Sequence, residues 1–107
     1  MLNKEGCKIM TITSKQRAYL MKLASSLDPI FHVGKSSLTP EIVEGIGQAL
    51  DKRELIKVGI LKNCTDDPKA IAECISERTH SIVVKIIGKK IILYKRNHKN
   101  PKIELPK

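Results

Sequence analysis

The sequence contains no tryptophan, and its aromatic residues are one phenylalanine and two tyrosines. So few rings exclude the aromatic platform on which many proteins stack unpaired bases. No run of about 18 apolar residues occurs, so we expect no transmembrane helix. The first residues also lack the apolar segment of a secretory signal, which makes the cytoplasm the expected location.

Cysteine and histidine are too sparse and too scattered for the common disulfide and metal frameworks. Reduced thiols are expected, because the cysteines are odd in number and lack paired spacing: Cys7, Cys64 and Cys74. The histidines stand singly, without an HExxH pattern: His32, His80 and His98. No catalytic arrangement of Ser, His and Asp or of Cys and His can be located from spacing. We therefore expect no enzyme activity, no metal and no cofactor.

Acidic residues are scarce beside basic ones. The chain has 11 Asp and Glu against 20 Lys and Arg, a formal net charge of +9 and a pI near 9.6. Its 107 residues suffice for one domain with a single core and are too few for a multidomain enzyme. A surplus of this size predicts a polyanionic partner, of which nucleic acid is the commonest, over a basic surface kept for solubility alone.

The two ends of the chain differ from its middle. Residues 1–10 show no periodicity, and we interpret them as a disordered extension. Residues 11–96 hold the periodic segments and form the predicted domain. Residues 97–107 combine basic residues with Pro101 and Pro106, which is typical of an extended basic tail.

The first periodic segment predicts a helix that Thr13 or Ser14 caps and Asp28-Pro29 ends. Its apolar residues recur at helical spacing: Leu20, Leu23, Ala24 and Leu27. A second stripe carries Lys15, Tyr19 and Lys22. This stripe is either a solvated face or a ridge that contacts phosphates, and spacing alone does not choose between the two.

The remaining segments alternate between strand and helix and close on a hairpin. They are a strand at 30–33, a helix at 40–53, a strand at 55–61, a helix from Asp66 or Asp67 to Thr79, and strands at 81–87 and 90–94 around Gly88-Lys89. The order helix-strand-helix-strand-helix-strand-strand predicts an α/β (α+β) fold, a mixed four-stranded sheet with packed helices. Gly45 and Gly47 lie inside the 40–53 helix, and close packing would explain one of them.

The turn between the 30–33 strand and the 40–53 helix has the composition of a phosphate-binding loop. Gly34 can take a positive φ and allows close approach to the backbone. Lys35 adds a charge, and Ser36 and Ser37 add small hydroxyls. Thr39 is a good N-cap with proline after it, so free N–H groups at the helix start lie beside the loop.

Several segments in one order resemble a known family. They are Ser14-Lys15-Gln16-Arg17, Val33-Gly34-Lys35-Ser36-Ser37-Leu38-Thr39, Leu55-Ile56-Lys57-Val58, Ile87-Gly88-Lys89 and Leu93-Tyr94-Lys95-Arg96. The arrangement resembles the CRM domain, the chloroplast RNA-splicing and ribosome-maturation module, and most closely its bacterial single-domain form of the YhbY type. The resemblance covers about Thr11 to Pro106.

The resemblance implies a fold similar to the C-terminal domain of translation initiation factor three. It also implies RNA binding and association with precursors of the large ribosomal subunit. Members of the family typically carry a GxxG loop, like that of KH domains, at the position of Gly34 to Ser37. Here Ser37 stands where the second glycine is expected, and serine tolerates positive φ less well than glycine.

The expected mechanism is contact with the phosphates of structured RNA by loop N–H groups and cations, with modest sequence preference. The candidate RNA-binding residues come from the loop and from basic segments: Gly34, Lys35, Ser36, Ser37, Lys15, Arg17, Lys22, Lys89, Lys90, Lys95 and Arg96. We expect a monomer that binds ribosomal RNA and neither a membrane nor a small-molecule substrate.

Other functions stay open. A protein-binding, ribosome-associated factor would use exposed apolar side chains, for which Leu38 and the 55–61 strand give a weak indication. A nucleotide site is less favoured, because Gly34-Lys35-Ser36 resembles the end of a Walker A motif whose first glycine is replaced by Pro29. DNA binding would share the charge, but the sequence shows no helix-turn-helix pair or zinc spacing.

Overall fold

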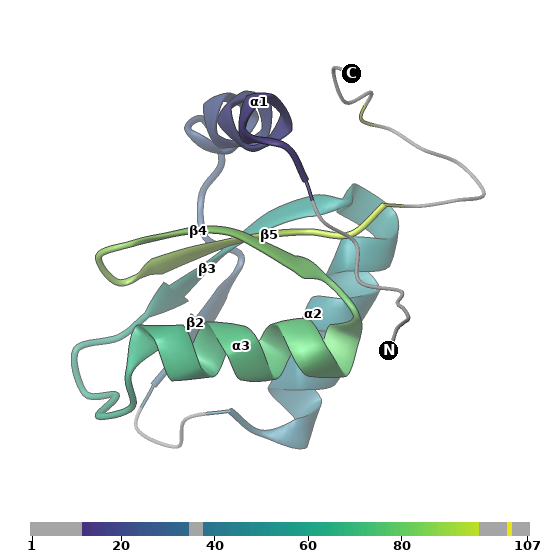
Figure 1. Ribbon diagram of the computed structural model, residues 1–107. Helices are drawn as coiled ribbons and strands as arrows, with labels where there is room; N and C mark the ends of the chain where they lie inside the picture. The colour runs from purple at the N-terminus through teal and green to yellow at the C-terminus, as the bar shows by residue number, and fades with distance from the viewer. Residues whose placement is uncertain (1–11, 35–37, 97–102, 104–107) are drawn as a thin grey trace, which may run out of the picture.

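The computed structural model describes residues 12–34, 38–96 and 103, which form three helices and a four-stranded sheet (Figure 1). The elements are α1 (Ser14–Ala24), β2 (Phe31–Val33), α2 (Pro40–Arg53), β3 (Leu55–Ile60), α3 (Pro68–Thr79), β4 (Ile82–Ile87) and β5 (Lys90–Tyr94). The predicted order and fold class are confirmed. The extension at 1–10 and the tail at 97–107, apart from Ile103, lie outside the described residues and stay predictions.

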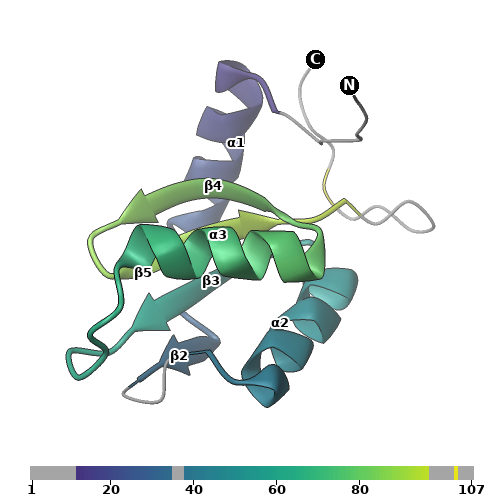
Figure 2. The same cartoon turned by 60° about the horizontal axis from the view of Figure 1, so that its bottom comes forward.

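The sheet is mixed, with strand order β2-β3-β5-β4. β2 runs parallel to β3, whereas β5 pairs antiparallel with both β3 and β4. One face is covered by α2 and α3, and α1 lies on the other (Figures 1 and 2). We name them the α2/α3 face and the α1 face. None of the helices in the described part of the chain is long and apolar enough to cross a membrane.

Alternation along the strands divides the core between the two faces. On β3, Ile56, Val58 and Ile60 pack under α2 and α3, as the alternation predicts. The cluster under α1 consists of Leu20, Ala24, Leu55, Val84, Ile92 and Tyr94. Twelve buried residues form the first cluster and six the second, so α1 covers only part of its face.

Each helix begins where its capping residues predict. The Gln16 N–H donates to the Thr13 hydroxyl at 3.1 Å, and the Thr13 N–H donates to the Gln16 side chain at 3.0 Å, which completes a capping box. Thr39 accepts a hydrogen bond from the Ile42 N–H at 3.2 Å, and Asp67 caps α3. The local sequence therefore fixes all three helix starts.

The predicted end of the first helix is wrong. α1 ends at Ala24, with Ser25 as its C-cap, several residues before Asp28-Pro29. The Ser25 hydroxyl donates to the Lys22 carbonyl at 2.7 Å. Such side-chain bonds compete with continuation of the helical backbone pattern.

The helical spacing of Ile71, Cys74 and Ile75 predicts that they form the buried face of α3, and this prediction needs one correction. Ile71 and Ile75 are buried as expected, and Ala72 is buried beside them. Cys74, expected in the core, is only half-buried, whereas Cys64 is buried in the cluster under α2 and α3. Both of these cysteines are free thiols.

The two glycines inside α2 have different neighbours. A Cβ at Gly45 would lie 3.0 Å from Cε1 and from Cζ of Phe31, so the missing side chain lets that ring pack against the helix. A Cβ at Gly47 would lie 3.7 Å from Cγ2 of Thr79, which is an ordinary contact. Close packing therefore explains Gly45, and nothing in the described residues requires a glycine at 47.

Arg17 joins α1 to the sheet. Its Nη1 donates to the Val84 carbonyl and lies 3.4 Å from the Val83 carbonyl. The register of β4 against β5 is irregular between Val83 and Lys85, where a ladder leaves backbone groups without strand partners. The guanidinium supplies hydrogen-bond donors at this irregularity.

Tyr94, at the end of β5, is 1% exposed. Its hydroxyl has no hydrogen-bond partner in the described part of the chain. Burial raises the pKa of Tyr94 above its usual value of 10.0, the Glu54 carboxylate raises it further, and Arg96 opposes them. The folded protein therefore holds this proton more tightly than the unfolded chain does.

Replacement of Gly47 by alanine is expected to raise the free energy of unfolding by about 0.5 to 1 kcal/mol, because alanine is the better helix former and its Cβ fits. Gly45→Ala is expected to gain less or to lose stability, because the Phe31 ring must move. Urea unfolding followed by circular dichroism compares the two variants. Equal stabilisation by both would contradict the packing account of Gly45.

Arg17→Ala is expected to lower the free energy of unfolding by about 1.5 to 3 kcal/mol, the usual contribution of hydrogen bonds to a charged group. Lys15→Ala, on the exposed side of the same helix, serves as the control and should change it by less than about 0.5 kcal/mol. Urea denaturation measures both. An unchanged stability of Arg17→Ala would show that the guanidinium does not hold α1 on the sheet.

Tyr94→Phe is expected to keep or raise stability at neutral pH, because the lost hydroxyl has no partner. Above pH 10 the unfolded chain loses this proton before the folded protein does, so the stabilisation present below pH 10 declines with rising pH. The phenylalanine variant has no titrating hydroxyl at this position, so it lacks this decline in stability above pH 10. Unfolding free energies of both proteins between pH 8 and about pH 11 measure the difference, and identical profiles would contradict the raised pKa.

Candidate nucleic-acid interface

The predicted phosphate loop joins the end of β2 to the beginning of α2 (Figure 2). Gly34 leads into the loop beside β3, where the Leu61 N–H donates to the Val33 carbonyl at 2.8 Å. Thr39 caps α2 on the far side of the loop. A helix N-terminus offers backbone donors to an anion. The other predicted loop residues lie outside the described residues: Lys35, Ser36 and Ser37.

The turn between β4 and β5 lies at the same end of the sheet as this loop. Val33 pairs with Ile60, and the Ile60 N–H donates to the Lys89 carbonyl at 2.7 Å. Lys89 and Lys90 are both exposed. The structure therefore brings Gly34 and these two lysines to one end of the sheet.

Lys95 and Arg96 lie at the opposite end, because β5 runs from Lys90 to Tyr94. The Lys95 Nζ forms an ion pair with the Asp51 carboxylate at 3.0 Å. Arg96 is exposed. The predicted cations therefore do not form one patch, and RNA contact by these two residues stays a prediction.

The predicted residues on α1 divide into two groups. Lys15 and Lys22 are exposed, and Tyr19 between them is 37% exposed, so the second stripe of the helix faces solvent. Arg17 instead turns its guanidinium to the carbonyls of β4. Its observed contacts give it a positioning role for the helix that carries the two lysines.

Part of the α1 face is not covered by α1. The residues there lie in register across all four strands: His32, Gly59, Lys90 and Ile87. None of them belongs to the cluster under α1. His32, Lys90 and Ile87 are exposed, and a Cβ at Gly59 would lie 3.0 Å from Cδ2 of His32. The imidazole therefore lies close over the glycine, on the open side of the sheet.

Lys57 and Lys85 lie on the same face, one row closer to α1. Both pair with Ile92, which belongs to the cluster under α1, so both lysines share its face. Lys85 is exposed, and Lys57 is half-buried. The uncovered part of the sheet is named the open sheet surface and is formed by His32, Lys57, Lys85 and Lys90.

Charge is divided unequally between the layers. α1 and the four described strands contain no acidic residue, and their cations are Lys15, Arg17, Lys22, Lys57, Lys85 and Lys90. α2 and α3 carry both signs, and their acidic residues are Glu41, Glu44, Asp51, Glu73 and Glu77. Among the described elements, the side formed by α1 and the open sheet surface is therefore the electropositive one.

Sequence reasoning left three residues of the open sheet surface out of the candidate site: His32, Lys57 and Lys85. A signal was present for Lys57, because alternation along β3 put it on the face opposite Ile56 and Val58. Which part of that face stays open depends, however, on where α1 packs. The position of α1 depends on tertiary packing, which the periodicity of a sequence does not predict.

The geometry bears on the two alternative functions. α2 begins at Pro40, five residues after Lys35, whereas the helix of a Walker A loop begins at the Lys-Ser/Thr step. Leu38 packs against the cluster under α2 and α3, so it is not a free apolar contact. The apolar face of β3 lies in the same cluster. The described residues contain no group of three or more His, Cys, Asp or Glu that could hold a metal ion.

Known proteins resemble this chain over nearly its whole length. A Bacillus subtilis protein named "Probable RNA-binding protein YqeI" is 42% identical, over 89% of this chain and 99% of that protein. A Haemophilus influenzae protein named "RNA-binding protein" is 33% identical, over 91% of this chain and 97% of that protein. The solution structure of hypothetical protein SAV1595 from Staphylococcus aureus matches with a TM-score of 0.76 and 44% identity, over 90% of this chain and 100% of that one.

The family model described as the CRS1 / YhbY (CRM) domain matches residues 12–95, which include every helix and strand described above. The match agrees with the resemblance seen in the sequence motifs. The chain therefore belongs to the CRS1 / YhbY (CRM) domain family.

Proposed function

We propose that the protein binds RNA through the open sheet surface and the exposed side of α1. The observation that carries this proposal is the absence of acidic residues from α1 and the described strands, beside their cations. A helix and strands without carboxylates attract phosphates, and their lysines release counterions from the phosphates that they contact. The two relatives named as RNA-binding proteins support the same function.

Recognition on this surface proceeds through the RNA backbone. Lysine ammonium groups contact phosphates and position a protein without reading sequence. Of the three aromatic residues, Phe31 packs against Gly45 and Tyr94 is buried, which leaves Tyr19 exposed. One ring does not make a stacking platform, so structured RNA is recognised mainly by its shape and its 2′-hydroxyls.

The loop from Gly34 to Ser37 forms a second proposed contact. The N-terminus of α2, capped by Thr39, follows this loop, and Lys89 lies at the end of the sheet where the loop begins. Lys35, Ser36 and Ser37 would place charge and hydroxyl groups beside those N–H donors. Lys95 and Arg96 would extend the contact toward the other end of β5.

Ribosomal RNA of large-subunit precursors is the partner that we propose, with the protein acting in the cytoplasm as a monomer and without catalysis. The resemblance to the ribosome-maturation module supports this choice of RNA. The free thiols of Cys64 and Cys74 agree with a reducing compartment.

Replacement of Lys57, Lys85 and Lys90 by alanine together is expected to weaken RNA binding at all salt concentrations. Each lost phosphate contact should also reduce the slope of log affinity against log salt by about 0.7 to 0.9. Fluorescence anisotropy with a fragment of large-subunit ribosomal RNA, titrated from low to physiological salt, measures both effects. A DNA duplex of equal length tests whether RNA is preferred.

The matched control removes three exposed cations from α2 and α3: Lys52, Lys69 and Arg78. It changes net charge equally, so it should lower affinity less if position matters. If the two triple variants lost equal RNA affinity, the effect would depend on net charge and not on position, which would contradict the proposed surface. Lack of RNA binding by the unaltered protein even at low salt would contradict the function itself.

A further inference from the structure

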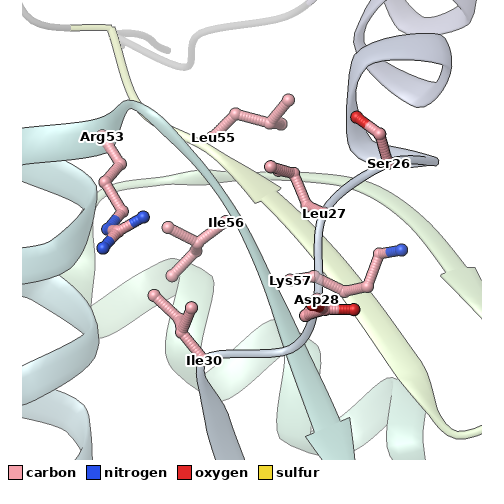
Figure 3. Close-up of a pocket in the computed structure, with 8 residues that line it drawn as sticks. All are labelled: Ser26, Leu27, Asp28, Ile30, Arg53, Leu55, Ile56 and Lys57. Atoms are coloured by element: carbon pink, nitrogen blue, oxygen red, sulfur yellow. The ribbon is translucent and has the colours of Figure 1, made fainter.

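A cavity of about 350 Å³ opens where β2 begins (Figure 3). Residues 55–57 of β3 have no partner in β2, because pairing between these strands starts at Val58. The segment from α1 to β2 passes this gap, and Leu27 and Ile30 from it line the cavity together with Ile56. The cavity thus lies between the segment that joins α1 to β2 and the C-terminal end of α2.

Aliphatic side chains make up half of the cavity lining, and polar or charged side chains make up the other half; Asp28, Arg53 and Lys57 form what we call its charged rim. Ile30 is 38% exposed, which is high for an isoleucine in a well-packed domain. The Arg53 guanidinium reaches toward the cavity from the last turn of α2, and Lys57 and Asp28 lie on the other side (Figure 3). Neither the Arg53 side chain nor the Lys57 side chain has a hydrogen bond or ion pair within the described part of the chain. Both cations are therefore available to a ligand.

The size and chemistry of the cavity select a class of ligand. A volume near 350 Å³ lies at the lower end of small-molecule sites, which suits one planar ring system rather than a folded segment. Aliphatic side chains contact the faces of a nucleobase, and the planar guanidinium of arginine stacks on bases as aromatic rings do. Lys57 belongs both to this rim and to the open sheet surface, so the cavity is continuous with the proposed phosphate-binding area.

We propose that this cavity holds one unstacked base of the bound RNA, with Arg53 against the base and Lys57 near an adjoining phosphate. This inference rests on the proposed RNA-binding function and adds a base-binding site to it. Contacts with the RNA backbone alone do not favour an unpaired nucleotide over a paired one. A base-binding cavity favours the unpaired nucleotide, because its base enters the cavity without the cost of breaking a pair.

The test compares two RNA hairpins of the same stem sequence, one fully paired and one with a single-nucleotide bulge. We expect the bulged hairpin to bind about tenfold more tightly, as stacking of one base allows. It should also shift the methyl resonances of Leu27, Ile30 and Ile56 in NMR spectra of the full-length protein. The paired hairpin should leave those resonances largely in place.

Arg53→Lys keeps the charge and removes the planar group, so it should abolish the preference for the bulge and retain affinity for the paired hairpin. Arg78→Lys makes the same exchange at an exposed position of α3 and should keep the preference. Circular dichroism confirms that both variants fold.

The outcomes separate the two proposals. Equal binding of both hairpins, with unmoved cavity resonances, overturns the base site and leaves RNA binding intact. Binding of neither hairpin overturns both proposals. A bulge preference that survives Arg53→Lys, or that disappears equally in Arg78→Lys, also overturns the role assigned to this cavity.

Discussion

The docking of α1 on one half of a sheet face determines what the other half can do. Leu20 and Ala24 bury their side chains against this face, and Arg17 bonds to carbonyls of β4 at the irregular part of its register. These contacts cover the end of the sheet that includes Tyr94 and leave the row through Lys90 open. Apolar packing and charge-assisted hydrogen bonds therefore act together to define the exposed surface.

The same arrangement explains where charge is tolerated. A strand buried on both faces reads as a continuous apolar run, because a lysine at such a position would lose its hydration without a partner. Lys57, Lys85 and Lys90 interrupt their strands only on the α1 face, beyond the buried cluster. Among the described helices and strands, acidic residues occur instead on α2 and α3, the opposite layer. The excess of positive charge therefore lies mainly on the α1 side of the sheet. An uneven charge distribution of this kind steers a polyanion toward one side of a protein.

Local signals were sufficient for most of the fold. The start of α2 follows from the Thr39 cap, and β5 follows from the hairpin turn at Gly88-Lys89 and the apolar run after it, signals that act over a few residues. The end of α1 was missed because the Ser25 side chain competes for the backbone before Pro29 is reached. Arg17 and the open sheet surface were beyond sequence reasoning for another reason. Their roles depend on contacts between segments distant in the chain, such as Arg17 with Val84.

The short length of β2 leaves part of one edge of β3 uncovered. Proline is found in strands mainly at edges and beginnings, and β2 is an edge strand that begins two residues after Pro29. The last backbone bond toward β3 on this side is from the Ile30 N–H to the Lys57 carbonyl at 3.0 Å. Beyond it, β3 continues to Leu55 paired only with β5, and the cavity lies at the edge that a longer β2 would cover. Pro29 thus lies just before the point where β2 begins to pair with β3, next to the cavity.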